Sequence, residues 1–121
     1  MSSSATASAA EDNAKIQLRK GVLEYCILSI LSHGDSYAPK IIAELKAAEM
    51  IVVEGTIYPL LTRQKNAGLL DYRWEESSQG PPRKVYTLTE KGVETLALLD
   101  RAWLELNEQI SRLKERPNTT Y

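Results

Sequence analysis

Two short segments constrain the fold of this chain more than any other part of it: residues 55–61, with the sequence GTIYPLL, and residues 80–89, with the sequence GPPRKVYTLT. The first has the apolar spacing of a helix. The second starts with turn residues, continues as a strand and ends at Thr89, which can cap a following helix. Helix, hairpin and helix in so short a span predict a winged helix-turn-helix.

Length and composition agree with one small domain. The chain has 121 residues, of which 43% are hydrophobic and 26% charged, as in ordinary soluble globular proteins. A core this small gains stability from a partner subunit. Cys26 is the single cysteine, which rules out an intramolecular disulfide and suits a reducing cytoplasm. No segment resembles a signal peptide or a membrane span, so we expect a cytoplasmic protein.

Apolar periodicity predicts four helices joined by short connections. We expect them at residues 15–32, from a cap at Asp35 or Ser36 to about residue 48, at 54–66 and at 89–116. Residues 50–53 predict a small strand because they are largely β-branched. The Ser/Ala-rich residues 1–14 are expected to be a disordered tail, and residues 117–121 a second tail.

A hairpin is predicted between the third and fourth helices. Leu70, Tyr72 and Trp74 alternate with polar residues, as in a half-buried strand, and residues 84–88 form the return strand. Pro81 and Pro82 cannot donate ladder hydrogen bonds, so we expect them at the tip. The fold class is therefore mostly α with a small β-hairpin: a winged helix domain at residues 15–88 and a long C-terminal helix.

The helix at residues 54–66 separates into two faces at about 100° per residue. The inward face consists of Ile57, Leu60, Leu61 and Gln64. The outward face carries hydroxyls, an amide, a cation and residues that permit close approach. Its members are Gly55, Pro59, Thr62, Arg63 and Asn66, with Thr56 beside them and Tyr58 and Lys65 on the flank. Such groups contact phosphates and base edges. The alternative is an ordinary solvated helix face.

Net charge limits how this chain can bind nucleic acid. The formal charge is −1, which excludes a globally cationic binder. From Lys15 to Lys65 there are seven basic and five acidic residues, a mild local excess of two. Any specific DNA binding therefore needs focused contacts.

At these residues the sequence resembles the PadR family of bacterial transcriptional regulators. The matching motifs are residues 55–61, Lys65-x-x-Gly68-Leu69-Leu70, residues 83–89 and Gly92. The resemblance implies a homodimer, held by the C-terminal helix, that represses transcription until a ligand or stress signal relieves it. It also places Tyr37, Gly55, Thr56, Tyr58 and Pro59 in the DNA-facing elements, and Arg83 and Lys84 in the wing.

From these arguments we expect double-stranded DNA as the partner. Phosphate contacts are assigned to Lys15, Arg19, Lys20, Lys40, Tyr58, Arg63, Arg83 and Lys84. Base-edge or close-approach contacts are assigned to Thr56, Pro59, Thr62 and Asn66. The chain departs from the family pattern at Val53 and Glu54, where a capping residue and proline are common, and at Ala38-Pro39, where a Gly-aromatic pair is common.

The last helix carries a coiled-coil seam with apolar residues three and four apart. Its members are Leu96, Leu99, Trp103, Leu106, Ile110 and Leu113. The seam predicts a homodimer, and a two-fold protein predicts an inverted-repeat operator. Trp103 is either a large interface anchor or part of a pocket for a planar aromatic effector, as in some small PadR-like regulators.

Residues for catalysis or for a cofactor are not arranged in any known pattern. His33 is the single histidine and lies at a predicted helix end, while Cys26 lies on an apolar stripe. The chain has no zinc-ligand spacing, phosphate-binding Gly loop or nucleophile elbow, so we expect neither an enzyme nor a cofactor. Two alternatives to simple repression are a protein-interaction winged helix without DNA binding and a multidrug-sensing subtype.

Overall fold

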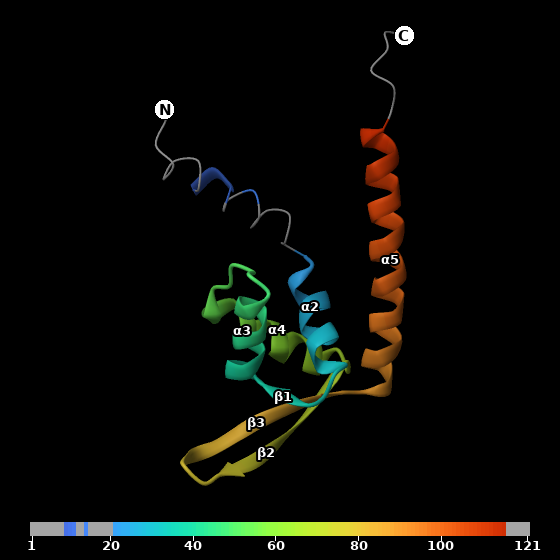
Figure 1. Ribbon diagram of the computed structural model, residues 1–121. Coiled ribbons are helices and arrows are strands. Elements are labelled where there is room, and N and C mark those ends of the chain that lie inside the picture. Colours follow the sequence, from blue (N-terminus) through green and yellow to red (C-terminus); the bar gives the residue numbers. More distant parts are fainter. Residues whose placement is uncertain (1–8, 12–13, 15–20, 116–121) are drawn as a thin grey trace.

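The computed structural model describes residues 9–11, 14 and 21–115. It confirms a mostly helical fold with a small antiparallel sheet, in which three helices pack above the sheet and a long fourth helix stands beside them (Figure 1). The elements are α2 (Leu23–Leu31), β1 (Ser36–Tyr37), α3 (Ala38–Ala47), α4 (Glu54–Asn66), β2 (Leu70–Ser77), β3 (Gly80–Leu88) and α5 (Glu90–Lys114).

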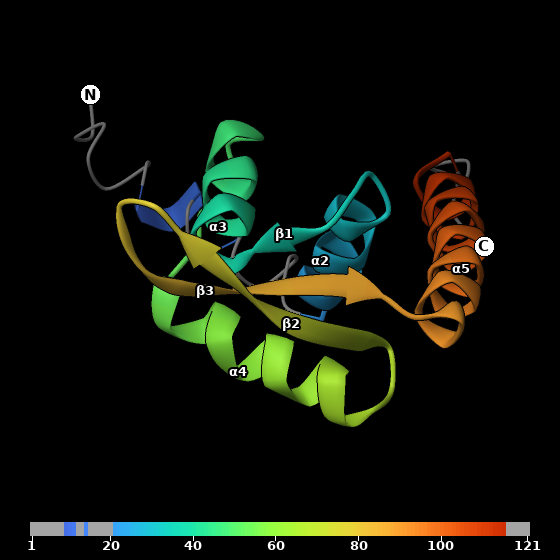
Figure 2. The ribbon, with the colours of Figure 1, turned by 90° about the horizontal axis from the view of Figure 1, so that it is seen from below.

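The sheet has the order β1-β3-β2, with both pairs antiparallel. The β2–β3 ladder begins at the Leu70–Leu88 pair and continues to Glu75–Arg83. Its far end projects beyond the helices as a twisted ribbon (Figures 1 and 2). The hairpin is therefore a wing, attached to the body at one end only.

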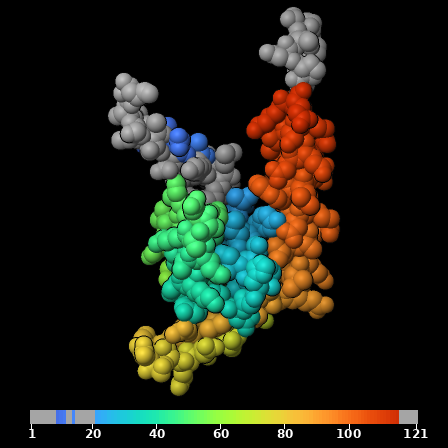
Figure 3. All heavy atoms as spheres, in the orientation of Figure 1, coloured from blue at the N-terminus to red at the C-terminus, as the bar shows by residue number. Residues whose placement is uncertain are grey.

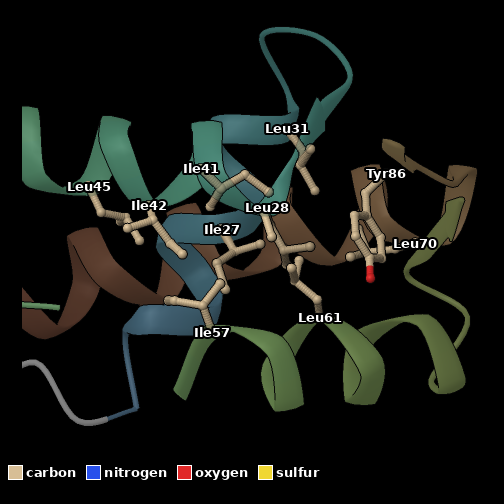
Figure 4. Packing of buried hydrophobic residues seen from close by; sticks show 11 residues of the cluster. Ile27, Leu28, Leu31, Ile41, Ile42, Leu45, Ile57, Leu61, Leu70 and Tyr86 are labelled. Atoms are coloured by element: carbon tan, nitrogen blue, oxygen red, sulfur yellow. The ribbon is translucent and has the colours of Figure 1, made fainter. Parts of the chain in front are cut away.

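The core lies between α2, α3, α4 and the base of the wing (Figure 4). Its fully or nearly fully buried side chains are Ile27, Leu28, Leu31, Ile41, Ile42, Leu45, Ile57, Leu61, Leu70 and Tyr86. Gln64 is 1% exposed and Leu60 packs against the core, which confirms the predicted inward face of α4. With that face buried, the opposite face of α4 must point to solvent.

The start of α5 docks on the turn that follows α4. The Thr89 hydroxyl accepts a hydrogen bond from the Gly92 amide at 3.0 Å and donates one to the Gly68 carbonyl at 2.6 Å. The Thr89 amide donates to the Leu69 carbonyl at 3.0 Å. Gly68 ends α4 with φ +81°, a conformation that favours glycine. The predicted cap and the predicted helix end are both confirmed.

The second predicted helix begins later than expected, and the first is not continuous from residue 15. Gly21 has φ +95° in a turn before α2 starts at Leu23, and the predicted helical residues 15–20 lie outside the described residues. Neither Asp35 nor Ser36 caps α3. Ser36 instead pairs with Tyr86 in β1, and the α3 N-cap, Tyr37, makes no side-chain cap. The pairing depends on a strand 50 residues away in sequence, which local capping patterns do not reveal.

Two strand predictions were wrong in position. Residues 50–53 form no strand, and the strand that pairs with the second edge of β3 is β1. Pro81 and Pro82 lie within β3, not at the tip, which is the turn at residues 78–79. They face a register irregularity between Glu75 and Ser77, where the ladder requires no proline amide.

The segment before the winged domain is described in part. Residues 9–11 and 14, which fall in the segment expected to be a disordered tail, are helical and exposed. Within the described part of the chain, we find no helix with the length and apolar character needed to cross a bilayer.

Gly92→Ala tests the docking of α5. A Cβ at this position would lie 2.2 Å from the Leu69 carbonyl oxygen, so backbone must move. We expect a net loss of about 2 kcal/mol in the free energy of unfolding, since overpacking outweighs the helix propensity gained. Urea unfolding followed by circular dichroism measures it. Gly55→Ala is the matched control: its Cβ meets open space in a helix, so it should be neutral or slightly stabilising, and equal effects would contradict the prediction.

Candidate nucleic-acid interface

A groove of about 440 Å³ runs between the N-terminal end of α3, the outer face of α4 and β3. Its lining residues are Tyr37, Ala38, Pro39, Tyr58, Thr62, Arg83, Lys84 and Tyr86. The fold thus brings together side chains from three separate predicted elements. Tyr37 reaches the groove because β1 holds it against Val85, next to the wing cations.

The wing cations Arg83 and Lys84 lie within β3, several residues after the turn at residues 78–79. Arg83 pairs with Glu75 across the ladder, and Lys84 pairs with Trp74. As neighbours in a strand they point to opposite faces of the sheet. Both side chains nevertheless line the groove beside α4.

Aromatic rings hold both wing cations. The Arg83 guanidinium carbon lies 4.5 Å from the Tyr37 ring centroid, and its Nη2 donates to the Ser77 hydroxyl at 3.3 Å. The Lys84 ammonium lies 4.0 Å from the Tyr72 ring centroid. Among the residues that the structure describes, neither cation has a carboxylate partner. Their charge is therefore available to an anionic ligand.

Arg73, on the same hairpin, is by contrast neutralised. Its guanidinium donates to Asp35 at 2.7 Å and to Glu75 at 3.3 Å. The hydrogen bond from Arg73 lowers the pKa of Asp35, and the same contact raises the pKa of Arg73. This ion-paired group ties the wing to the loop before β1 and adds no net positive charge to its surface.

The outer face of α4 is exposed at every position expected to contact DNA. These positions are Gly55, Thr56, Tyr58, Pro59, Thr62, Arg63 and Asn66. Tyr58 is 51% exposed although it is a large aromatic residue. Val53, the N-cap, has no capping side chain, and the Thr56 hydroxyl instead donates to the Val53 carbonyl at 2.6 Å.

Several other predicted DNA contacts lie apart from the groove. Arg63 forms an ion pair with Glu24 of α2, which places it on the flank of α4 that faces the domain. Lys40 is exposed on α3 without lining the groove. Glu54 is ion-paired with Lys46 at 3.1 Å, so its charge is compensated. The predicted contacts at Lys15, Arg19 and Lys20 lie outside the described residues.

Helix α5 is anchored by its first half only. Leu96 and Leu99 pack against the core, and the Tyr25 hydroxyl donates to Asp100 at 2.5 Å, which raises the pKa of Tyr25. The Trp103 ring lies 6.4 Å from the Tyr25 ring. Beyond this point α5 rises clear of the body (Figure 3). The rest of the seam is 42–66% exposed: Trp103, Leu106, Ile110 and Leu113.

Sequence reasoning missed the exposure of Trp74. We expected Leu70, Tyr72 and Trp74 to form one half-buried strand face. Leu70 is fully buried, Tyr72 is 38% exposed and Trp74 is 65% exposed. The gradient arises because the strand leaves the core as it enters the wing. The alternating sequence of the strand carries no signal of this gradient.

Comparisons with known proteins agree on one family. The model of the Transcriptional regulator PadR-like family matches residues 27–98. A PadR-like transcription factor from Bacteroides fragilis is 56% identical over 84% of this chain and 98% of its own, with a TM-score of 0.71. A PadR-like transcriptional regulator from Bacillus cereus is 36% identical over 84% and 99%, with a TM-score of 0.73.

A third structure extends the fold comparison to nearly the whole chain. A PadR family transcriptional regulator from Eggerthella lenta is 26% identical, covers 95% of this chain and 100% of its own, and has a TM-score of 0.82. Among curated proteins, the comparison found no significant match.

Asp35→Asn tests the ion pair that braces the wing. Because the folded-state pKa of Asp35 is below its ordinary value of 3.8, the pair stabilises the fold above that pH and the effect is lost as pH falls through the lower folded value. The pair is half-exposed, so we expect Asp35→Asn to cost less than about 1 kcal/mol at neutral pH. Urea unfolding over a series of pH values, from neutral downward through 3.8, measures this, and the difference from wild type should shrink as Asp35 becomes protonated in the folded state.

Asp71→Asn is the matched control for this measurement. Asp71 lies on β2, the strand that carries Arg73, and has no ion pair among the described residues. A loss of stability from Asp35→Asn that persists unchanged in acid would contradict the assignment.

Proposed function

Because the chain belongs to the PadR-like family of transcriptional regulators, we propose that it is a homodimeric repressor that binds double-stranded DNA in the cytoplasm at an inverted-repeat operator. One observation carries the proposal: the groove joins Tyr58 and Thr62 of α4 to Arg83 and Lys84 of the wing. A helix face with base-reading groups and two cations freed of carboxylates therefore lie on one surface.

In this proposal α4 enters the major groove. Thr62 and Asn66 offer a hydroxyl and an amide to base edges, while Gly55 and Pro59 let the backbone approach the duplex closely. Thr56 keeps its hydroxyl on the Val53 carbonyl and contributes its methyl group to the contact. The Tyr58 hydroxyl, beside the groove cations, is suited to a phosphate oxygen.

The wing supplies the electrostatic part of the binding. Arg83 and Lys84 are held by rings, which fix their positions without cancelling their charge. With 15 basic and 16 acidic residues, the chain has no overall excess of positive charge. Affinity therefore depends on these few groups, with Lys40 and the basic residues before position 21 as outlying phosphate contacts.

The exposed seam of α5 supports the dimer. Four large apolar side chains in a row on one helix face are unusual for a monomeric protein of this size. A second copy that covers them would present two α4 helices to half-sites about 34–36 Å apart, one turn of DNA.

An effector that relieves repression would act by changing the arrangement of the two subunits. The exposed part of the Trp103 ring is the candidate contact for a planar aromatic compound.

The alternative is a winged helix that docks a polypeptide and does not bind DNA. The low net charge is compatible with it, but the ring-held cations beside the exposed face of α4 favour DNA. Binding to a labelled duplex, selected from a random library by the wild-type protein, separates the two functions.

Arg83→Ala and Lys84→Ala should each weaken binding to that duplex. If each cation contacts one phosphate, each change reduces the slope of log affinity against log salt by about one. Fluorescence anisotropy over a salt series measures it. Lys114→Ala, at the exposed end of α5, is the control and should leave the slope unchanged. A wild-type slope in both wing variants would remove the wing from the interface.

Leu106→Glu should dissociate the dimer. Two carboxylates brought into an apolar seam repel each other and lose hydration, so we expect at least roughly 100-fold weaker association. Sedimentation velocity at micromolar concentration measures the change. Leu104→Glu is the control, since Leu104 is 62% exposed and lies roughly 130° around the helix from the seam. A monomeric wild-type protein, or a dimer in both variants, would contradict the seam.

A further inference from the structure

Arg63 of α4 is held away from the groove by a carboxylate of another helix. It forms an ion pair with Glu24 of α2 and does not line the groove beside Tyr58 and Thr62. The Arg63 side chain is nevertheless 65% exposed, and that of Glu24 is 34% exposed. Ion pairs in this much contact with water are weak, so a phosphate group can compete for the guanidinium. The pair therefore masks a cation of the outward face of α4 without burying it.

A second contact holds the same turn of α2 against α4. The Gln64 side chain is 1% exposed, and its amide nitrogen donates to the main-chain carbonyl of Glu24 at 3.1 Å. Arg63 and Gln64 are neighbours in α4, so the carboxylate and the carbonyl of Glu24 both contact one short segment of that helix. The place of the Glu24 carboxylate thus depends on how this turn of α2 sits on α4.

The next residue of α2 contacts α5. The Tyr25 hydroxyl donates to Asp100 at 2.5 Å, and the Tyr25 ring lies 6.4 Å from that of Trp103 in the seam. Neighbouring residues of a helix point about 100° apart, which lets Glu24 turn toward α4 while Tyr25 turns toward α5. Helix α2 lies between α3 and α5 in both ribbon views (Figures 1 and 2). One turn of α2 therefore connects the seam helix to the helix proposed to read DNA.

Packing at this joint is incomplete. A cavity of about 260 Å³ lies between α2, α4 and α5, with the lining residues Gly21, Glu24, Tyr25, Leu28, Gln64, Leu69, Thr95 and Leu99. The side-chain oxygen of Gln64 has no hydrogen-bond partner among the described residues. Protein interiors at normal density resist movement, whereas this cavity gives the first turn of α2 room to shift relative to α4.

We infer that Glu24 is a positioning residue that keeps Arg63 off nucleic acid in the free protein and yields it to a phosphate group of the bound duplex. The contact of Tyr25 with α5 sets how easily the pair opens. Arg63 follows Thr62, which lines the groove, so a duplex that covers the groove passes beside the guanidinium. The inference rests on the proposed DNA-binding function.

The restraint has two consequences for binding. Every duplex must displace Glu24 before Arg63 can contact a phosphate, so the ion pair lowers the affinity for all sequences. A shift of α5 that breaks the Tyr25–Asp100 hydrogen bond loosens the turn that carries Glu24. A change at the seam would in this way reach α4 through two adjacent residues of α2.

The first test replaces Arg63 in the full chain. Binding is measured by fluorescence anisotropy over a salt series, with a labelled duplex selected from a random library by the wild-type protein. Arg63→Gln should lose roughly threefold in affinity and reduce the slope of log affinity against log salt by about one, since one phosphate contact disappears. Arg63→Lys keeps the charge and is the matched control, which should keep the wild-type slope. A wild-type slope in Arg63→Gln would mean that Arg63 stays on Glu24 in the complex, and would overturn the inference.

The second test removes the restraint. Glu24→Gln should raise affinity roughly threefold, because Arg63 is then unmasked before binding, and should keep the wild-type slope. The gain should disappear when the change is made in Arg63→Gln, and a gain that persists there would reflect lost negative charge alone and overturn the inference. Glu44→Gln is the control for charge and should change affinity little, since Glu44 is exposed on α3 and has no ion pair within the described residues.

Tyr25→Phe tests the link to α5. It removes the hydroxyl that binds Asp100 and keeps the ring beside Trp103. We expect a gain of roughly twofold in affinity in the wild-type background and none in Glu24→Gln, because the two changes act on one contact. Wild-type affinity in Tyr25→Phe, or an equal gain in both backgrounds, would overturn the link.

Two further observations separate the possible failures. Urea unfolding midpoints of all variants distinguish a changed contact from a weakened fold. A wild-type slope in Arg63→Gln, with intact DNA binding by the wild type, would overturn this inference and leave the proposed function standing. A wild-type protein that selects no duplex would overturn both.

Discussion

The carbonyl group of Leu69 is where the three parts of this molecule meet. It accepts a hydrogen bond from the Thr89 amide at 3.0 Å, and Gly92 of α5 packs against it so closely that no side chain fits between them. The residue follows the turn that ends α4 and precedes the first ladder pair of the wing. The directions of α4, of the wing and of α5 are therefore set within a few residues of one backbone group. Only a few residues therefore separate the surface proposed to face DNA from the helix that carries the seam.

Several basic side chains of this protein fall into two groups: those paired with carboxylates and those held by aromatic rings. Arg63, Arg73 and Lys46 are held by carboxylates, and these pairs brace α2, the wing and the start of α4. Arg83, Lys84 and Lys65 rest on aromatic rings, which hold a cation without neutralising it. A chain with a net charge of −1 can in this way keep a positive surface in one place. The aromatic residues of β1 and the wing thus have an electrostatic role as well as a packing role.

Local signals in the sequence predicted much of this fold. The bounds of α4, its end at Gly68 and the Thr89 cap were predicted correctly, since each depends on residues within a few positions. Features that depend on distant pairing were not. Ser36 pairs with β3, residues 50–53 lack a partner, and the prolines of β3 sit at an irregularity of the ladder. The same limit applies to the candidate site. Tyr37, Tyr58, Thr62, Arg83 and Lys84 were among the predicted DNA contacts, whereas Ala38, Pro39 and Tyr86, which complete the groove, were not. The Arg63–Glu24 pair and the exposure of Trp74 likewise follow from tertiary arrangement.

Helix α4 continues through Pro59, and this has a chemical consequence for its outer surface. Proline has no amide hydrogen, so the carbonyl oxygen of Gly55 lacks the donor that a regular helix supplies four residues later. The oxygen belongs to the exposed first turn, where water can solvate it in the free protein. Pressed against a duplex, it becomes an acceptor supplied by the main chain, and exocyclic amines of adenine and cytosine are the base groups that can satisfy it. Such an acceptor belongs to the main chain, so substitution of Gly55 does not remove it, whereas a residue with an amide hydrogen at position 59 would restore the regular helical donor.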